Sequence, residues 1–270
     1  MSRLRQRLVT VIEQQPALAL FLFALLLGPA LVGPVRAGWV PPGFVQAGAL
    51  SASLAGVALT AVTGGAAAVR ALLARGIVWR VGYRWWIIVL LLPLVPAVGA
   101  RVGAAYVTGS TVDWVAMASL HRVVPSLLML TLLAGLGEEF GWRGFALSRL
   151  RARHGLLTAA LIVGAYHALW HIPLFFLPGE LYAMLAAQLG FPAAFAGYAC
   201  LVVALSLQLA WVFEGTKGSV LLVAVYHGAI NAWSGHATID QAGLSGQLAF
   251  DVCHMALSTV IVFIGRRSST

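Results

Sequence analysis

Residues 130–145 read LTLLAGLGEEFGWRGF, and the interpretation of the whole chain starts from this stretch. Its first half is apolar and predicts a membrane span, yet Glu138 and Glu139 stand side by side at its end. The chain contains only 8 acidic residues, so an adjacent pair in an apolar segment requires an explanation. A charged side chain inside a bilayer is energetically costly and is retained mainly where it has a function. The two glutamates are therefore the first candidate functional residues.

The composition is that of an integral membrane protein. Hydrophobic residues make up 61% of the chain and charged residues 9%, with a mean hydropathy of +0.92. An average soluble domain is about 25% charged. The net charge is +9, which in a soluble protein would suggest a nucleic-acid partner. The arginines cluster between apolar runs, and no strip of aromatic and basic residues accompanies them. We therefore interpret the positive charge as a sign of membrane topology and exclude a nucleic-acid partner.

About eight apolar runs are long enough to cross a bilayer, at roughly 20 residues each. They lie near residues 17–35, 43–66, 85–100, 122–141, 156–177, 191–213, 218–234 and 247–265. The first run follows MSRLRQR, and we interpret it as a retained span because no convincing cleavage site follows it. The expected fold is an all-α, polytopic bundle of about eight transmembrane helices. It fills residues 1–270 as one membrane domain, with a motif-bearing core at about 122–234.

The arginines predict the topology of this bundle. If both termini are cytoplasmic, only Arg36, Arg101 and Arg122 of the 17 basic residues lie in outer segments. This asymmetry follows the positive-inside rule. The segment 67–84 carries four arginines among several aromatic residues, which predicts an amphipathic stretch at the inner interface. The Arg-rich, Lys-poor composition favours a prokaryotic inner (plasma) membrane.

The acid pair divides between two environments if residues 138–143 are helical. Glu138 and Glu139 are then about 100° apart around the helix and face different neighbours. Glu139 and Arg143 are four residues apart, so they share a face and can neutralise each other. Glu138 is left to face a cavity. The alternative is that both acids simply lie at a hydrated helix end.

Two later runs carry polar side chains at helical spacing. His167 and His171 are four residues apart in GAYHALWHIPLFF, and His227 and Asn231 are four apart in VAVYHGAINAWSG. Each pair taken alone fits ordinary hydrogen bonding between membrane helices. Polar groups at this spacing on three separate spans, however, are explained more simply by one shared cavity.

These residues resemble the CPBP family, also called the ABI family, which includes type II CAAX prenyl endopeptidases and bacteriocin-processing or immunity proteins. The resemblance rests on three motifs in the family order: Glu138, Glu139 and Arg143; then His171; then His227 and Asn231. They extend over residues 138–231, about a third of the chain. One position departs from the pattern. The family commonly has an aromatic residue four positions before the second-motif histidine, and this chain has His167 there.

The resemblance implies an intramembrane protease acting on a peptide or lipidated membrane-protein substrate, including prenylated CAAX-type chains. Glu138 would take a proton from water, and His171 would hold that water. His227 and Asn231 would stabilise the oxyanion, while Glu139 and Arg143 would support the helix. No cofactor is certain, but zinc is a candidate. Glu138, His171 and His227 are the ligands we expect if a metal is present.

The expected depth of these residues creates a conflict within this interpretation. If the fifth run starts near residue 156, His171 lies about 24 Å along it, whereas Glu138 is near the cytoplasmic end of the fourth. The conflict disappears if both helices extend into the cytoplasm and the fifth helix ends early at HIPLFFLP. We therefore expect a site in the cytoplasmic half, open to the inner leaflet.

Two other functions fit the same residues. A proton-coupled transporter would use Glu138 as the proton site and the histidines as relays. A non-catalytic immunity or scaffold protein would keep the fold and bind another membrane protein. Loss of peptide hydrolysis on Glu138→Gln distinguishes the protease from both.

Overall fold

The structure is a computed structural model that describes residues 3–39, 47–112, 114, 120–177, 181–235 and 240–267. The described residues form helices joined by short connections, with no strand among them, and the prediction of an all-α bundle is confirmed. In chain order the helices are α1 (Arg3–Gln14), α2 (Pro16–Arg36), α3 (Leu50–Ala74), η2 (Arg75–Ile77), α4 (Tyr83–Leu91), α5 (Leu94–Thr108), α7 (Leu120–Leu130), η3 (Thr131–Gly135), α8 (Leu136–Glu139), η4 (Phe140–Leu147), α9 (Ser148–Leu150), α10 (Leu156–Trp170), η5 (Ile172–Phe176), α11 (Leu181–Leu189), α12 (Phe191–Gly215), α13 (Val220–Ser234) and α14 (Asp240–Arg267). Of these, η2 and η5 are 3₁₀ helices and η3 and η4 are π-helical.

Within the described residues, seven helical segments are long and apolar enough to span a membrane. They are Pro16–Pro34, Ala47–Ile77, Tyr83–Thr108, Val123–Leu150, Leu156–Phe176, Phe191–Gly215 and Leu244–Ile264. The expected eighth span, near 218–234, corresponds to α13, whose 15 residues are fewer than the roughly 20 that a bilayer requires. The chain is thus an integral, multi-pass membrane protein.

Several local features differ from the sequence expectation. The amphipathic helix α1 precedes the first span, and α11 fills the connection before α12. The third span is interrupted at Pro93, and its second half runs on to Thr108, so Arg101 is buried within α5 instead of following the helix. The expected interface segment 67–84 is not one continuous element. Its first part continues α3 beyond a kink at Gly65 (φ 68°), and the chain leaves helical geometry at Val78.

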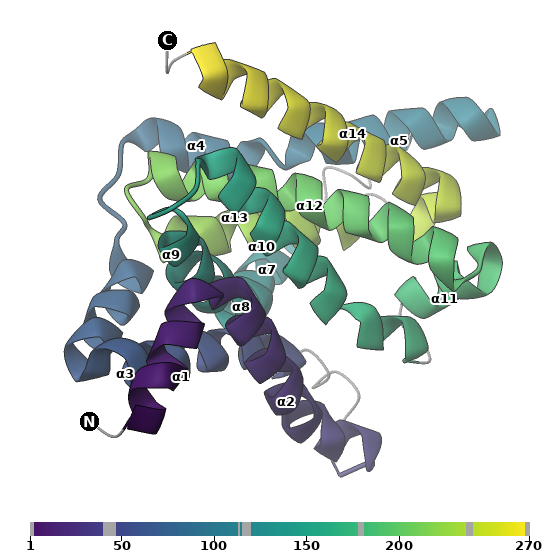
Figure 1. The fold of residues 1–270 in the computed structure, drawn as a ribbon. Helices are drawn as coiled ribbons and strands as arrows, with labels where there is room; N and C mark the ends of the chain where they lie inside the picture. Colours follow the sequence, from purple (N-terminus) through teal and green to yellow (C-terminus); the bar gives the residue numbers. More distant parts are fainter. Residues whose placement is uncertain are drawn as a thin grey trace.

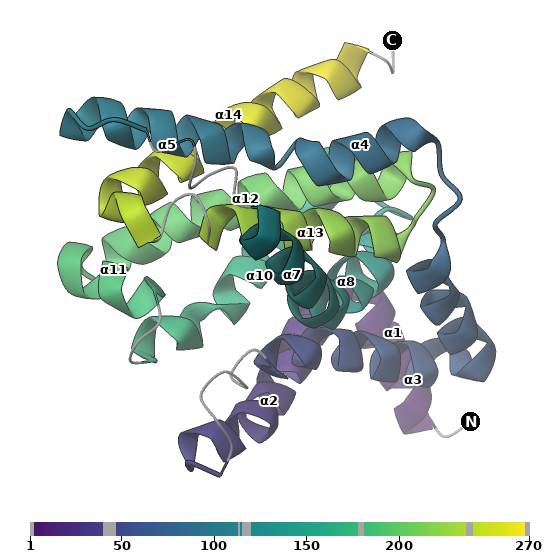
Figure 2. The same ribbon diagram turned by 180° about the vertical axis from the view of Figure 1, so that it is seen from behind.

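The central layer consists of α10, α12 and α13, with α5 and α14 packed together on one side and α2 and α3 on the other (Figures 1 and 2). The segment from α7 to α9 passes between α3 and α13 and contacts both. The largest buried cluster joins Leu20, Trp142, Val163, Leu209 and Tyr226 from five different segments. The acid-bearing segment therefore lies in the middle of the bundle.

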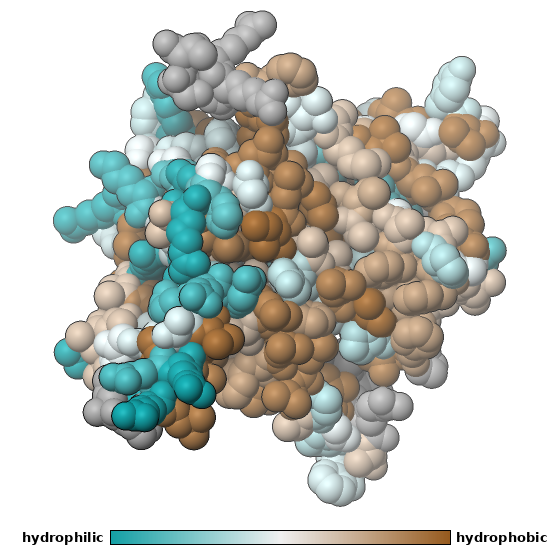
Figure 3. Space-filling view, viewed as in Figure 1, coloured by the Kyte–Doolittle hydropathy of each residue, from teal (hydrophilic) through white to brown (hydrophobic). Residues whose placement is uncertain are grey.

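Polar side chains gather over α1 and α9 at one edge of the molecule, whereas the face over α2 and α10 to α12 is mostly apolar (Figure 3). Ion pairs join the segments at this edge: Arg149 contacts Glu13 at 3.1 Å, and Arg151 contacts Glu214 at 2.9 Å. Three segments that the sequence assigned to the cytoplasm thus meet at one end of the bundle. The side chains of Arg36, Arg122, Arg266 and Arg267 lie outside the described residues, and the cytoplasmic placement of both termini stays a prediction.

Glycines allow the acid-bearing segment to approach its neighbours closely, as is common between membrane helices. A Cβ atom at Gly141 would overlap the carbonyl oxygen of Ala52 in α3, and one at Gly135 would overlap that of Ala224 in α13. Backbone atoms cannot rotate away as a flexible side chain can. These contacts fix how near Glu138 lies to the helices on both sides.

We expect Gly141→Ala to lower the free energy of unfolding by about 1–3 kcal/mol, the usual cost of overpacking. Gly197→Ala is the matched control, because Gly197 is an exposed helical glycine with no atom within 4 Å of its would-be Cβ. This control should be neutral or stabilising, by up to about 1 kcal/mol. Unfolding in mixed detergent micelles measures both variants. Equal stability of Gly141→Ala and the wild type would show that α3 and η4 are not in contact at this point.

Candidate functional site

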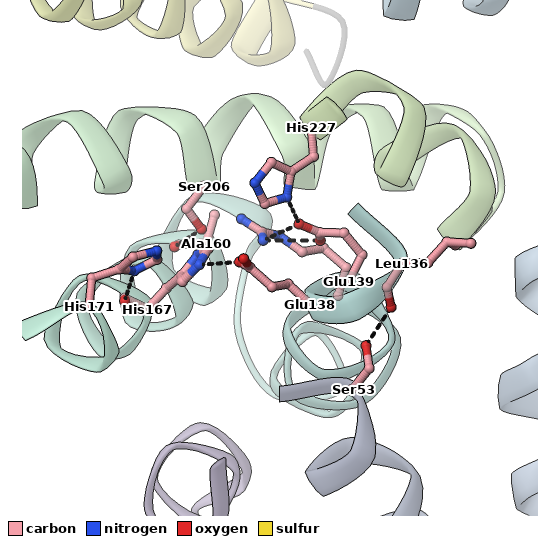
Figure 4. Close-up of polar contacts among 10 residues, drawn as sticks. Ser53, Leu136, Glu138, Glu139, Ala160, His167, His171, Ser206 and His227 are labelled. Atoms are coloured by element: carbon pink, nitrogen blue, oxygen red, sulfur yellow. Dashed lines mark hydrogen bonds and ion pairs between the residues drawn. The ribbon is translucent and has the colours of Figure 1, made fainter. Parts of the chain in front are cut away.

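The acid pair lies on α8, a single α-helical turn between two π-helical segments. A π-helical turn takes more residues than an α-helical turn and often occurs at functional sites. The hydroxyl of Ser53 in α3 donates to the carbonyl of Leu136 at 2.8 Å, which anchors the start of α8 (Figure 4). Both carboxylates are buried: Glu138 is 4% exposed and Glu139 is 0% exposed.

Glu139 is held by charged and polar partners from two helices. Nη1 of Arg143 donates to its two carboxylate oxygens at 2.9 and 3.0 Å, as the spacing of four residues predicts. Nδ1 of His227 in α13 lies 2.7 Å from Oε1 of Glu139 (Figure 4). Since a carboxylate accepts, Nδ1–H of the imidazole donates to it. Glu139 thus neutralises a buried arginine and orients His227, which leaves the Nε2 atom of that ring for a ligand.

Glu138 points to the other side, toward α10. Nε2 of His167 lies 2.8 Å from its Oε2 atom, and the imidazole donates this hydrogen bond to the carboxylate. The ring of His167 stacks on Trp142, with centroids 4.8 Å apart and an interplanar angle of 25°. Its Nδ1 atom is buried and has no hydrogen-bond partner among the described residues. His167 is therefore held against Glu138, the carboxylate for which the sequence predicted no ion-pair partner.

The orientation of His171 follows from its backbone contact. Its Nδ1 atom is 2.9 Å from the carbonyl oxygen of His167, one turn earlier in α10 (Figure 4). A carbonyl oxygen only accepts, so Nδ1 carries the proton and Nε2 presents a lone pair. The helix ends at Trp170, and the 3₁₀ turn that contains Pro173 follows directly. The early end predicted for this helix is confirmed, and His171, which directly follows the helix, lines the cavity.

These side chains line a cavity of about 790 Å³, within the usual range for ligand sites. Glu138, His167 and His171 line it together with His227 and Asn231 of α13. Most of the remaining wall is apolar and comes from α2, η5 and α12. A few polar groups therefore converge at one place in an otherwise apolar chamber.

The structure brings together the residues that the sequence selected on three separate spans. Glu138, His171, His227 and Asn231 all line this cavity, while Glu139 and Arg143 are buried beside it. One atom from each of Glu138, His167 and His171 lies within 4.8 Å of the others, which removes the conflict of depth. Among the described residues, the group that could hold a metal consists of Glu138, His167 and His171. The sequence had suggested His227 as the third ligand, and the structure has His167 instead.

Sequence reasoning missed two supporting contacts of this site. Ser53 was one of several polar residues in an apolar run, a signal that could have marked it as a helix contact. Trp142 lies between the motif residues Glu139 and Arg143, but its stacking on His167 depends on the packing of two helices. The sequence assigned no role to His167, because the family commonly has an aromatic residue at that position, and its contact with Glu138 joins two different helices.

Two comparisons with known proteins bear on this arrangement. Residues 120–233 match the sequence model of a family described as type II CAAX prenyl endopeptidase Rce1-like. The chain is also 29% identical over 106 residues to CAAX prenyl protease 2 of Methanococcus maripaludis, an alignment that covers 39% of this chain. The chain thus spans about 38% of the length of the curated relative it matches. The resemblance to the CPBP family is confirmed, and the family match contains every candidate site residue.

Proposed function

We propose that this protein is an intramembrane endopeptidase. It hydrolyses a peptide bond of a membrane-associated substrate with a water molecule activated by Glu138. The similarity of residues 120–233 to CAAX endopeptidases supports a protease of this class. The observation that carries the mechanism is the proximity of Glu138 and His171: a carboxylate oxygen and a ring nitrogen lie no more than 4.8 Å apart.

Two groups at such a separation can be bridged by one water molecule. Two atoms that each accept a hydrogen bond of about 2.8 Å from one water are about 4.6 Å apart when the angle at the water is near tetrahedral. Because Nε2 of His171 presents a lone pair, both Glu138 and His171 can accept from this water. Its oxygen lone pairs then face the cavity. Transfer of a proton to Glu138 as the oxygen attacks the peptide carbonyl is general-base catalysis.

His227 and Asn231 of α13 supply groups for the carbonyl oxygen. Attack makes this oxygen negative, and hydrogen-bond donors aimed at it lower the barrier most strongly in an apolar, water-excluded site. Asn231 lines the cavity and donates through a neutral amide, so its role does not depend on its protonation. His227 donates to Glu139 from Nδ1–H, and in its imidazolium form, with a second proton on Nε2, it is the second donor to the carbonyl oxygen.

The cavity favours a substrate with an apolar part. The apolar wall can accommodate a lipid chain or a hydrophobic helix end beside the scissile bond. A prenylated CAAX-type C-terminus, with the lipid attached to its cysteine, is therefore the first substrate class to test. We further propose that the protein resides in a prokaryotic inner (plasma) membrane, because its basic residues are almost all arginine.

The test is a cleavage assay on the purified full chain in lipid nanodiscs. Prenylated and unprenylated C-terminal peptides and short membrane-protein segments are analysed by mass spectrometry. We expect cleavage by the wild type and a fall in kcat of about 10²- to 10³-fold for Asn231→Ala, the usual effect of losing an oxyanion donor. Gln188→Ala, which removes an exposed carboxamide outside the cavity, should cut like the wild type.

The outcomes separate the alternative functions. Proton-coupled flux in liposomes without peptide cleavage would contradict the proposal and support a transporter. No cleavage and no flux, with an unchanged cellular effect of Asn231→Ala, would support a binding protein. Cleavage of equal rate by wild type and Asn231→Ala would remove Asn231 from the mechanism.

A further inference from the structure

His167 gives the cavity a third metal-ligating side chain next to Glu138 and His171. Among the described residues, these three form the group of histidines, cysteines and acids whose ligand atoms come together closely enough for a metal. We propose that a divalent cation of the zinc class binds Glu138, His167 and His171. The inference concerns the same cavity as the proposed function, and only its effect on catalysis rests on that function.

The three side chains need only small movements to bind a common cation. Ligands at about 2.0–2.1 Å from a tetrahedral zinc ion lie about 3.3–3.4 Å from one another. The contact between His167 and Glu138 is already 2.8 Å, and no pair in the group is separated by more than 4.8 Å. Side-chain rotation of about 1 Å at Glu138 and His171 is enough. Glu138 lies on α8, His167 lies on α10, and His171 directly follows the last residue of α10, so rotation of side chains does not require the backbone to move.

His171 has the hydrogen bond that is typical of a metal ligand. A histidine that binds a metal usually donates its other ring N–H to a backbone carbonyl or a carboxylate, which fixes the tautomer and the ring. Nδ1–H of His171 donates to the carbonyl of His167 at 2.9 Å. Its Nε2 atom is thereby left deprotonated and available as a ligand.

His167 can ligate without breaking any contact other than the one to Glu138. A cation on Nε2 requires the ring proton to move to Nδ1. This second nitrogen is buried without a hydrogen-bond partner among the described residues, so the proton displaces nothing there. A buried polar atom without a partner is uncommon and calls for an explanation. The Trp142 stack holds the ring in place in either tautomer.

The ligand types and charge favour zinc over magnesium or calcium. Two imidazole nitrogens and one carboxylate oxygen suit zinc-class ions, whereas magnesium and calcium prefer oxygen ligands alone. Glu138 contributes the negative charge, because the charge of Glu139 is matched by Arg143. The cavity leaves room for a fourth ligand such as water.

Cation binding has a direct consequence for the proposed mechanism. A carboxylate oxygen that ligates the cation, and a His171 Nε2 atom that does the same, no longer accept from the attacking water. Zinc on one oxygen of Glu138 lowers the basicity of the whole carboxylate, and zinc on Nε2 of His171 removes the second acceptor, so zinc opposes the water activation proposed above. We expect zinc to lower the rate of hydrolysis in proportion to its occupancy.

The binding experiment uses the untagged full chain in detergent, first stripped of metal with a chelator. Isothermal titration with Zn²⁺ and the visible absorption of bound Co²⁺ report on the site independently of activity. We expect one Zn²⁺ per chain, and at least about 100-fold weaker affinity for His167→Phe, since loss of an outer-shell partner alone costs roughly 10- to 100-fold. His154→Phe, which removes an exposed histidine, should bind like the wild type.

A second variant guards against a folding defect. His167→Gln keeps a side-chain amide that can donate to Glu138, yet it should lose affinity to the same extent. Absence of zinc binding by the wild type, or unchanged affinity in His167→Phe and His167→Gln, would overturn the proposal. So would loss of affinity in His154→Phe.

The activity experiment measures the rate of each variant with Zn²⁺ relative to its own rate without Zn²⁺. Differences in basal rate between variants therefore do not affect the comparison. The Zn²⁺ concentration for half-inhibition should rise at least about 100-fold in His167→Gln, in step with the weaker binding. If zinc binds through His167 but no peptide is cut under any condition, the proposed function fails and the metal site stands. If peptides are cut and zinc does not bind, only the metal site fails.

Discussion

Replacing Glu138 by glutamine is expected to lower kcat for peptide hydrolysis by about 10²- to 10⁴-fold, the contribution typical of a general base. The amide can still hydrogen-bond to Nε2 of His167 in place of the carboxylate, so the packing of α8 against α10 should persist. What is lost is the ability to take a proton from water. Single-turnover cleavage in nanodiscs measures the rate, and thermal unfolding of the same sample verifies the fold.

Glu13→Gln is the control for Glu138→Gln. It removes a carboxylate that pairs with Arg149 at the polar edge of the bundle, outside the cavity. We expect wild-type hydrolysis from this variant. If Glu138→Gln cuts at the wild-type rate while folded, the mechanism is wrong, even if the chain is a protease.

The largest expected effect on stability is that of Arg143→Met. Arg143 and Glu139 are both 0% exposed, and the ion pair is the main compensation for the charge on Glu139. Removing one partner of a buried pair leaves an uncompensated charge and usually costs about 3–5 kcal/mol. Among the described residues, the contact from His227 is the one that would remain on the carboxylate. The free energy of unfolding in mixed detergent micelles should fall by that amount.

The double variant Glu139→Gln with Arg143→Met tests the cause of this loss. Replacing both partners removes the unpaired charge, so most of the stability should return. Arg151→Met is a second control, because the Arg151–Glu214 pair is partly exposed, and such pairs contribute about 0–1 kcal/mol. A loss below about 1 kcal/mol for Arg143→Met would mean that water reaches Glu139.

Helices and their approximate extents could be predicted because they depend on local composition. Apolar runs of sufficient length correspond to each of the seven candidate spans. The sequence did not predict the break at Pro93, the burial of Arg101, or helices α1 and α11. A proline can end, kink or merely interrupt a helix, and the outcome depends on which neighbouring helix satisfies the exposed carbonyl groups. Short helices outside the spans give a weak hydropathy signal.

The pairing of Glu139 with Arg143 was readable from the chain, because residues four apart on one helix must be neighbours. The same rule placed His167 beside His171 and His227 beside Asn231. It could not show that Glu138 contacts His167, or that Glu139 holds His227, because these contacts join different helices. The π-helical segments around α8 also change the direction of the carboxylates in a way that a regular helical spacing does not describe.

The amino-acid sequence by itself determined the membrane class, the helical spans and the candidate residues that line the cavity. These follow from hydropathy and from spacing along single helices, which are local properties. Only the tertiary structure decided that one carboxylate contacts His167 of α10 while its neighbour pairs with Arg143 and accepts a hydrogen bond from His227. The glycines at positions 135 and 141 allow the close approach of helices on which this division depends. Such contacts depend on how whole helices pack, and no spacing within one segment encodes them.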